Sequence, residues 1–208
     1  LVLECIAGLT QANIDGQNTF FDGLVRLAAS EEHLEGIAPA DFVVVADVSG
    51  SMNGHKIEQL KSTMHWLIDN LNERHRMCII TFNNQADRKT PLTVMNAAGK
   101  VKLLAAVHGI AANGGTNIAL ALNLAAAVLD ERVHKDAATI CVLLTDGQDN
   151  AAREGGKQAI ASIAKKALLA CVGLGEDHDA KLLSELSHQA HGTFEYCPDA
   201  DAIAPTIG

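Results

Sequence analysis

The sequence is poor in three features, and each shortage excludes a class of protein. Aromatic residues make up 3% of the 208 residues, so the core must consist mainly of aliphatic side chains and alanine. Lysine and arginine form no cluster and the formal net charge is −9, which argues against nucleic-acid binding. The longest apolar run, residues 118–129, contains Asn123 and is shorter than the roughly 20 residues that a membrane-spanning helix needs. The sequence therefore predicts neither nucleic-acid binding nor direct membrane insertion.

Cysteine occurs five times, an odd number that cannot pair completely within one chain. Cys78, Cys141 and Cys171 lie in apolar runs typical of buried strands, where a free thiol behaves as a small hydrophobic group. We predict that these three thiols are buried and reduced. Free, buried thiols favour an intracellular protein over a secreted one.

The remaining composition, 48% hydrophobic and 20% charged, is ordinary for one globular domain with a short appendage. Residues 1–38 form the appendage. Within it, residues 1–9 and 24–29 have the pattern of two strands, and the polar residues 10–19 join them. We predict that this β-strand extension packs on the main domain, residues 39–208.

Short apolar runs alternate with amphipathic segments in the main domain. The runs predict a buried parallel strand at residues 42–47 and a second buried strand at 77–82. Further strands are expected at 139–144 and 168–174, a last short one at 192–196, and an edge strand at 90–94. Helical periodicity predicts helices at residues 55–71, 97–107, 118–129, 154–166 and 180–190. The polar side of the first helix carries Lys56, Glu58, Lys61 and Asp69. The alternation predicts an α/β fold with a mainly parallel, helix-covered sheet, which binds ligands at the carboxyl ends of its strands.

Three loops at this edge of the predicted sheet carry oxygen ligands. Residues 47–51 follow the first buried strand with the pattern D-x-S-x-S, residues 114–116 open the apolar helix, and residues 145–147 follow another buried strand. Alternate residues of an extended turn can direct Asp47, Ser49 and Ser51 to one centre. Mg²⁺ takes about six oxygen ligands in near-octahedral geometry. The loops therefore predict a site for a hard divalent cation.

These motifs resemble a known metal site. D-V-S-G-S-M at residues 47–52, G-G-T-N at 114–117 and L-L-T-D-G-Q-D-N at 143–150 are similar to the metal-ion-dependent adhesion site of von Willebrand factor type A domains. The resemblance extends from Asp41 to Tyr196, and it is greatest to the intracellular members that accompany RING fingers, although this sequence contains no RING finger.

The resemblance implies a Rossmann-like fold, with five parallel strands, one short antiparallel edge strand and helices on both faces of the sheet. It also implies that the hydroxyls of Ser49, Ser51 and Thr116 ligate the metal, and that Asp47 and Asp146 bind it directly or through water. The implied cofactor is Mg²⁺, with Mn²⁺ or Ca²⁺ as alternatives. The implied partner is a protein whose Asp or Glu carboxylate completes the metal's coordination.

Two simpler interpretations of the D-x-S-x-S segment compete with a metal site. One is a helix-capping turn, since serine before a helix commonly caps it. The other is an EF-hand loop, but Met52 stands where that loop needs glycine, and a strand rather than a helix is predicted before it. Asp149 and Asn150 are more typical of a polar loop than of additional ligands.

Two histidine-containing segments also suggest chemistry. His188, His191 and Cys197 have a loosely zinc-like spacing, but a surface histidine pair beside a half-buried cysteine is the favoured interpretation. His178 is expected in the loop before a helix, without a catalytic role.

Enzyme signatures are missing from the sequence. It contains neither a G-x-S-x-G nucleophile elbow nor a G-x-x-x-x-G-K-[ST] phosphate loop. We therefore predict a metal-dependent binding module and no enzyme. A metal-independent scaffold domain and, less favoured, a metal-assisted hydrolase remain as alternatives. In adhesion relatives the last helix moves with the metal loops, and here that helix corresponds to residues 199–207.

Overall fold

The computed structural model describes residues 39–132, 137–147, 149 and 156–197, together with four short strands near the N-terminus. The chain divides into two compact units, residues 1–37 with 202–208 and residues 38–201. In the first unit, β1 (Val2–Leu3) pairs antiparallel with β4 (Leu27–Ala28), and β2 (Ala12–Ile14) pairs antiparallel with β3 (Gln17–Thr19). The polar stretch that was expected only to join two strands thus contains a hairpin of its own. Packing of this extension on the main domain remains a prediction.

The second unit is built on a central sheet with the strand order β11-β10-β9-β5-β6-β7, and β8 also pairs with β6. Its strands are β5 (Ala40–Asp47), β6 (Arg76–Phe82), β7 (Ala86–Arg88), β8 (Thr93–Val94), β9 (Ala138–Thr145), β10 (Leu168–Leu174) and β11 (Phe194–Cys197). The five from β11 to β6 run parallel, and β7 and β8 run antiparallel to β6. The predicted fold class, a mainly parallel Rossmann-like sheet, is confirmed.

The antiparallel edge differs from the expectation of one strand at residues 90–94. It consists of two short segments, β7 and β8, among the residues described. Pro91 cannot donate to a strand ladder, and the Thr90 hydroxyl rather than a backbone carbonyl accepts the amide of Ile79, at 2.9 Å. The strand pairing is therefore interrupted between Arg88 and Thr93.

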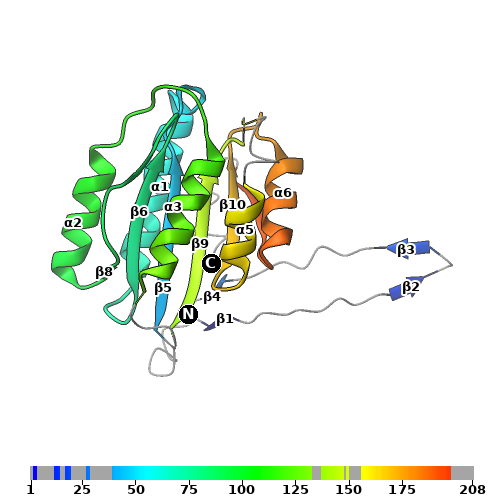
Figure 1. Cartoon of the computed structure of the whole chain (residues 1–208), viewed down its shortest axis with the longest axis horizontal. Helices are drawn as coiled ribbons and strands as arrows, with labels where there is room; N and C mark the ends of the chain where they lie inside the picture. The colour runs from blue at the N-terminus through cyan, green and yellow to red at the C-terminus, as the bar shows by residue number, and fades with distance from the viewer. Residues whose placement is uncertain are drawn as a thin grey trace. The chain divides into compact units, whose positions relative to one another are not determined.

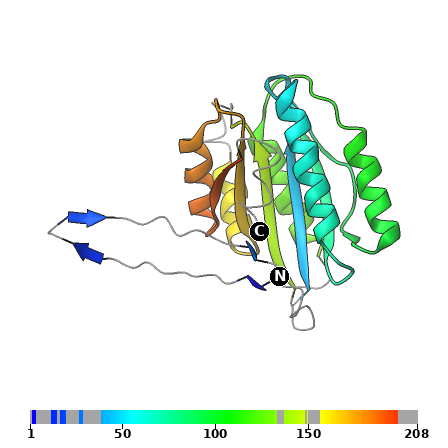
Figure 2. The ribbon, with the colours of Figure 1, turned by 180° about the vertical axis from the view of Figure 1, so that it is seen from behind.

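Helices cover both faces of this sheet (Figures 1 and 2). They are α1 (His55–Asn70), α2 (Ala97–His108), α3 (Ile118–Asp130), α5 (Lys157–Ala164) and α6 (Ala180–Gln189), with the short 3₁₀ helix η2 (Gly50–Met52) before α1. Helices α3, α5 and α6 lie on one face, while α1 lies on the other beside α2. Within the described ranges, no helix is long and apolar enough to cross a membrane. The helix expected at residues 199–207 lies outside the described residues.

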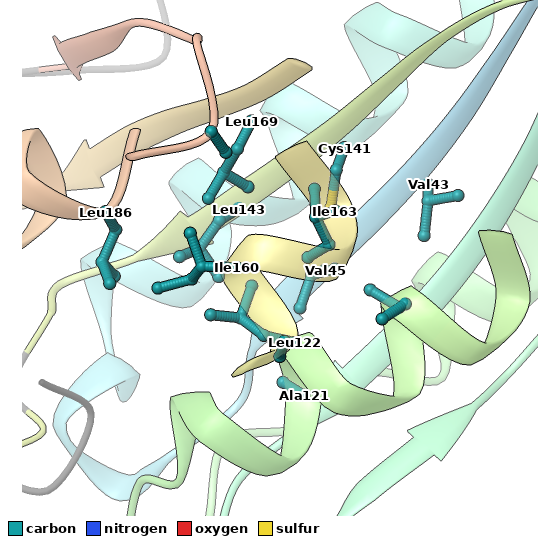
Figure 3. Close-up of a cluster of buried hydrophobic side chains, with 14 of the residues drawn as sticks. Val43, Val45, Ala121, Leu122, Cys141, Leu143, Ile160, Ile163, Leu169 and Leu186 are labelled. Carbon is teal, nitrogen blue, oxygen red and sulfur yellow. The ribbon is translucent and has the colours of Figure 1, made fainter. Parts of the chain in front are cut away.

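The core between the sheet and α3, α5 and α6 is aliphatic and rich in alanine, as predicted (Figure 3). Val43, Val45 and Leu143 of the sheet are fully buried in it, together with Ala121 and Leu122 of α3. The small alanine side chains of α3 let its backbone approach the strands closely. This packing holds the carboxyl ends of β5, β6 and β9 in fixed positions, and the three oxygen-rich loops belong to this edge.

The predicted buried thiols are confirmed. Cys78, Cys141 and Cys171 are buried and free, as is Cys197. Burial raises the pKa of the Cys78 thiol to about 11 and that of Cys141 to about 12. These cysteines therefore serve as small core residues in the folded domain.

A buried ionic cluster stabilises the opposite end of the sheet. The carboxylate of Asp41, at the start of β5, accepts two hydrogen bonds of 2.7 Å from Arg76 and one of 2.6 Å from Nε of Arg132. The side chains of Asp41 and Arg132 are 1% and 5% exposed. The cluster links β5 and β6 to the segment that follows α3.

Candidate metal centre

Asp47 is the last residue of β5 and is fully buried. Its Oδ1 accepts the Ser49 amide at 2.8 Å, and its Oδ2 accepts the Thr145 hydroxyl at 2.5 Å. Burial raises the pKa of this carboxyl from 3.8 to about 6; the hydrogen bonds from Ser49 and Thr145 lower it, and the charge of Asp146 raises it further. The structure thus fixes a carboxylate whose negative charge is incompletely balanced.

The two serines of the D-x-S-x-S segment lie next to Asp47. The hydroxyl oxygens of Ser49 and Ser51 are 3.1 Å apart, with Ser49 buried and Ser51 exposed. Ser49 makes no side-chain capping hydrogen bond to η2, and α1 begins after Gly54 without a side-chain cap. The capping interpretation is therefore wrong, and the strand before the loop also contradicts an EF-hand.

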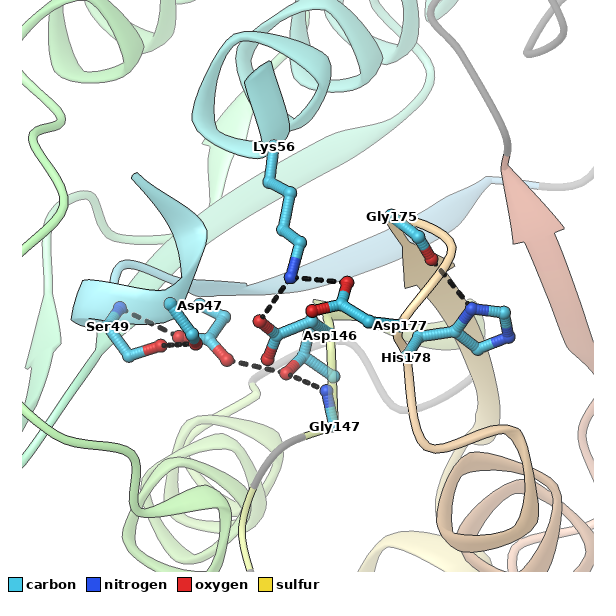
Figure 4. A network of polar contacts seen from close by, with 10 residues as sticks. Asp47, Ser49, Lys56, Asp146, Gly147, Gly175, Asp177 and His178 are labelled. Carbon is cyan, nitrogen blue, oxygen red and sulfur yellow. Dashed lines mark hydrogen bonds and ion pairs between the residues drawn. The ribbon is translucent and has the colours of Figure 1, made fainter. Parts of the chain in front are cut away.

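Asp146 follows β9 and is fully buried. Its Oδ2 accepts a hydrogen bond of 3.0 Å from Nζ of Lys56, and the same ammonium lies 2.7 Å from Oδ1 of Asp177 (Figure 4). The sequence pattern placed Lys56 on the polar side of its helix. It missed that this first-turn side chain reaches the carboxyl edge of the sheet.

The glycine-containing loop contacts the D-x-S-x-S loop through its backbone. The Gly50 amide donates to the Gly114 carbonyl at 2.8 Å, and a Cβ at Gly50 would lie 3.0 Å from that oxygen. Thr116 is half-buried and follows two residues later. Among the described residues, no hydrogen bond joins the Thr116 side chain to the other four predicted ligands. The backbone hydrogen bond places this loop beside the D-x-S-x-S loop, but it does not determine the direction of the Thr116 hydroxyl.

Asp149 lies in the loop after β9, as expected, but its side chain is buried. Its Oδ2 accepts the amide of Ile118 at 2.7 Å, at the first residue of α3. This bond joins the loop after β9 to the helix that the glycine-containing loop precedes. Asn150 lies outside the described residues.

The turn between β10 and α6 closes another side of the site. The Asp179 amide donates to the Asp146 carbonyl at 2.9 Å, and the Asp179 carboxylate caps α6. His178 lies in this turn, as expected, with its ring stacked on Tyr196 at a centroid distance of 4.6 Å. Its Nδ1 lies 2.8 Å from the Gly175 carbonyl (Figure 4). These contacts hold the turn against Asp146.

The donor chemistry of the centre suits a hard cation. In the part of the chain that is described, no three His, Cys, Asp or Glu side chains are grouped so that they could hold a metal, and this includes His188, His191 and Cys197. A cation at the candidate centre would depend on two carboxylates supplemented by hydroxyls. Such oxygen donors fit Mg²⁺, Mn²⁺ or Ca²⁺ better than zinc.

A cavity of about 300 Å³ adjoins the candidate centre. Val48, between Asp47 and Ser49, forms part of its wall, as does Asn113 of the glycine-containing loop. Its other walls come from the end of β6, from β7 and from the segment after α2. The cavity therefore borders the loop after β5 and the glycine-containing loop, although none of the five predicted ligands lines it.

The fold and site define a Rossmann-like α/β domain with clustered oxygen donors at the carboxyl edge of a parallel sheet. The family model of the von Willebrand factor type A domain matches residues 41–206. The chain therefore belongs to the von Willebrand factor type A family, whose domains serve as protein-interaction modules.

Individual relatives agree with this assignment. The chain is 38% identical over 112 residues to the E3 ubiquitin-protein ligase WAV3 of Arabidopsis thaliana, covering 53% of this chain and 15% of the ligase. It is 33% identical over 160 residues to inter-alpha-trypsin inhibitor heavy chain H4 of Homo sapiens, covering 72% of this chain and 17% of the heavy chain. The chain thus spans less than a fifth of either relative.

Solved structures share the fold. A von Willebrand factor type A protein from Catenulispora acidiphila superimposes with a TM-score of 0.72 and 25% identity, over 80% of this chain and 40% of that one. The manganese-loaded TRAP protein of Plasmodium vivax gives a TM-score of 0.64 at 19% identity, over 80% of this chain and 71% of that one.

Proposed function

We propose that this domain binds partner proteins in a manner that depends on a divalent cation. The observation that carries the proposal is the grouping of Asp47, Ser49 and Ser51, with Asp146 near enough to raise the pKa of Asp47. Thr116 is the fifth proposed ligand, because its loop is hydrogen-bonded to Gly50.

The donor set favours binding over catalysis. When bound, the metal supplies an electrophilic centre that accepts a carboxylate from outside. Ser49, Ser51 and Thr116 offer neutral oxygens, so most of the metal's charge is left for Asp47, Asp146 and the partner to balance. An Asp or Glu side chain of the partner is the ligand that this charge balance selects.

We propose Mg²⁺ as the natural metal, with Mn²⁺ and Ca²⁺ as alternatives. The shared fold with a manganese-loaded protein supports the use of Mn²⁺ as an experimental probe. The adjoining cavity is proposed to receive a side chain that flanks the partner's carboxylate.

A scaffold domain that needs no metal is the second candidate. The observation in its favour is Lys56, whose ammonium already pairs with Asp146. A hydrolase or ligase activity of this segment is not proposed, because the one relative that is named as an E3 ligase is matched over 15% of its length only.

Calorimetry with MnCl₂ alone tests the metal site. The unaltered domain should bind one Mn²⁺, and Asp146→Asn should weaken binding at least about 100-fold because a charged ligand is lost. Asp130→Asn is the matched control, since Asp130 is an exposed acid at the C-terminal end of α3 and pairs with Lys166. Equal heats from the unaltered domain and Asp146→Asn would contradict the proposed ligand set.

A peptide library tests the partner chemistry. Random peptides with a fixed central Asp should be retained by the domain in MgCl₂ and released by EDTA. A second library with Asn at that position should not be retained. Equal retention with and without EDTA would instead favour the metal-independent scaffold.

A further inference from the structure

Lys56 occupies an unusual position for a lysine. Its ammonium lies between two carboxylates, 3.0 Å from Asp146 and 2.7 Å from Asp177, and its side chain is 16% exposed. Asp146 is fully buried, whereas Asp177 is 60% exposed. One end of the ion-pair network is therefore inside the candidate centre and the other is at the surface (Figure 4).

The turn after β10 encloses the stem of this lysine. Gly175 has φ +81°, and a Cβ added to it would lie 2.5 Å from Cε of Lys56 and 3.0 Å from Asp177. A side chain at residue 175 would therefore displace the lysine. The turn after β10 therefore packs closely against the Lys56 side chain, which comes from the first turn of α1.

The position of Lys56 changes the net charge of the side chains at the candidate centre. Asp47, Asp146 and Asp177 supply three negative charges when ionised, and Lys56 supplies one positive charge. Without the lysine, the negative charges of Asp47 and Asp146, which are both buried, would lack a nearby positive charge that reduces their repulsion. With the lysine, the net charge of these four side chains is −2 instead of −3, so their attraction for a divalent cation is weaker.

We propose that Lys56 is the resident counter-cation of the metal-free centre. It holds Asp146 and Asp177 together when no divalent ion is bound, and its charge opposes binding of that ion. This inference rests on the proposed function, because it concerns the affinity of the same centre for metal. The consequence is a moderate affinity for metal, so that the occupancy of the centre changes with the concentration of free metal.

The proposal predicts two effects of opposite sign for Lys56→Met. In EDTA the melting temperature should fall by about 4–8 °C, because a buried carboxylate loses its ammonium partner. In calorimetry, Mn²⁺ should bind about tenfold more tightly, because a positive charge close to the ion is removed. Structural damage to the centre would lower both stability and affinity.

Matched variants separate charge from shape. Lys61→Met places the same side chain on the same helix at an exposed pair with Glu58 and should change neither quantity. Asp177→Asn should weaken Mn²⁺ binding several-fold, because Lys56 then pairs with Asp146 alone. This second variant changes an exposed residue, so it keeps the test valid if Lys56→Met does not fold.

The outcomes distinguish the two proposals. Absence of Mn²⁺ binding by the unaltered domain would refute the proposed function. Binding by that domain combined with weaker binding by Lys56→Met, or with unchanged or tighter binding by Asp177→Asn, would overturn the role of Lys56 alone. An unchanged melting temperature of Lys56→Met in EDTA would also overturn it, whatever the metal does.

Discussion

In the metal-free protein, the contribution of Asp47 to the free energy of unfolding should decrease as the pH rises from about 4 to about 7. Burial raises the pKa of this carboxyl from 3.8 to about 6, so the folded state binds its proton more tightly than the unfolded state does. The stabilisation is complete below pH 3.8 and is lost as the pH passes through 6. The shift corresponds to about 3 kcal/mol.

Asp47→Asn isolates this effect from that of the other titrating groups. The amide cannot ionise but can still accept the Ser49 amide hydrogen. At pH 7 the variant should be more stable than the unaltered domain by about 2 kcal/mol, after the weaker interaction with Thr145 is allowed for. At pH 4 the difference should disappear, and at every pH the variant should fail to bind Mn²⁺.

Urea unfolding in EDTA at several pH values measures this difference directly. If the two proteins gave parallel stability profiles between pH 4 and 7, the assignment of the raised pKa to Asp47 would be wrong. A gain in stability together with loss of metal binding would indicate that the centre is optimised for its ligand at the expense of the fold.

The second large effect is expected at the opposite end of the sheet. Asp41→Asn should lower the free energy of unfolding by about 3–5 kcal/mol, because it removes the charge of a buried carboxylate that pairs with the guanidinium groups of Arg76 and Arg132. Arg76 loses its paired hydrogen bonds at the same time. Metal binding by the protein that remains folded should be unchanged, since the cluster lies at the other end of β5.

Urea unfolding and Mn²⁺ calorimetry on the same samples check both parts of this prediction. The control is Asp87→Asn, which breaks an exposed ion pair with Lys89 and should cost less than about 1 kcal/mol. A loss as small as that of the control would show that the buried cluster contributes little. Loss of Mn²⁺ binding by folded Asp41→Asn would contradict the independence of the two ends.

The sequence predicted the central strands well because parallel strands are buried on both faces. Continuous apolar runs such as residues 42–46 or 141–144 follow directly from that burial. The edge was harder to predict, since β7 and β8 are short and partly exposed. Their pairing depends on the neighbouring strand β6 rather than on a pattern of their own.

The candidate centre was predictable to the level of its loops. Asp47, Ser49 and Ser51 are close in sequence, so their proximity follows from local geometry, and Asp146 follows a neighbouring parallel strand. Lys56 and Asp177 were missed because they meet only through the packing of α1 against the turn after β10. Helical periodicity identifies a polar side but gives no information on which distant loop that side faces.

Burial of the four cysteines among the described residues affects how fast the folded domain can be chemically modified. Alkylating and oxidising reagents attack the thiolate, and burial of Cys78, Cys141 and Cys171 suppresses both ionisation and access. Their chemical modification must therefore wait until the sheet opens, and the rate of damage is governed by the frequency of such openings. Any ligand that binds the folded domain more tightly than the opened one will consequently protect these sulfur atoms, even though it binds far from them in sequence.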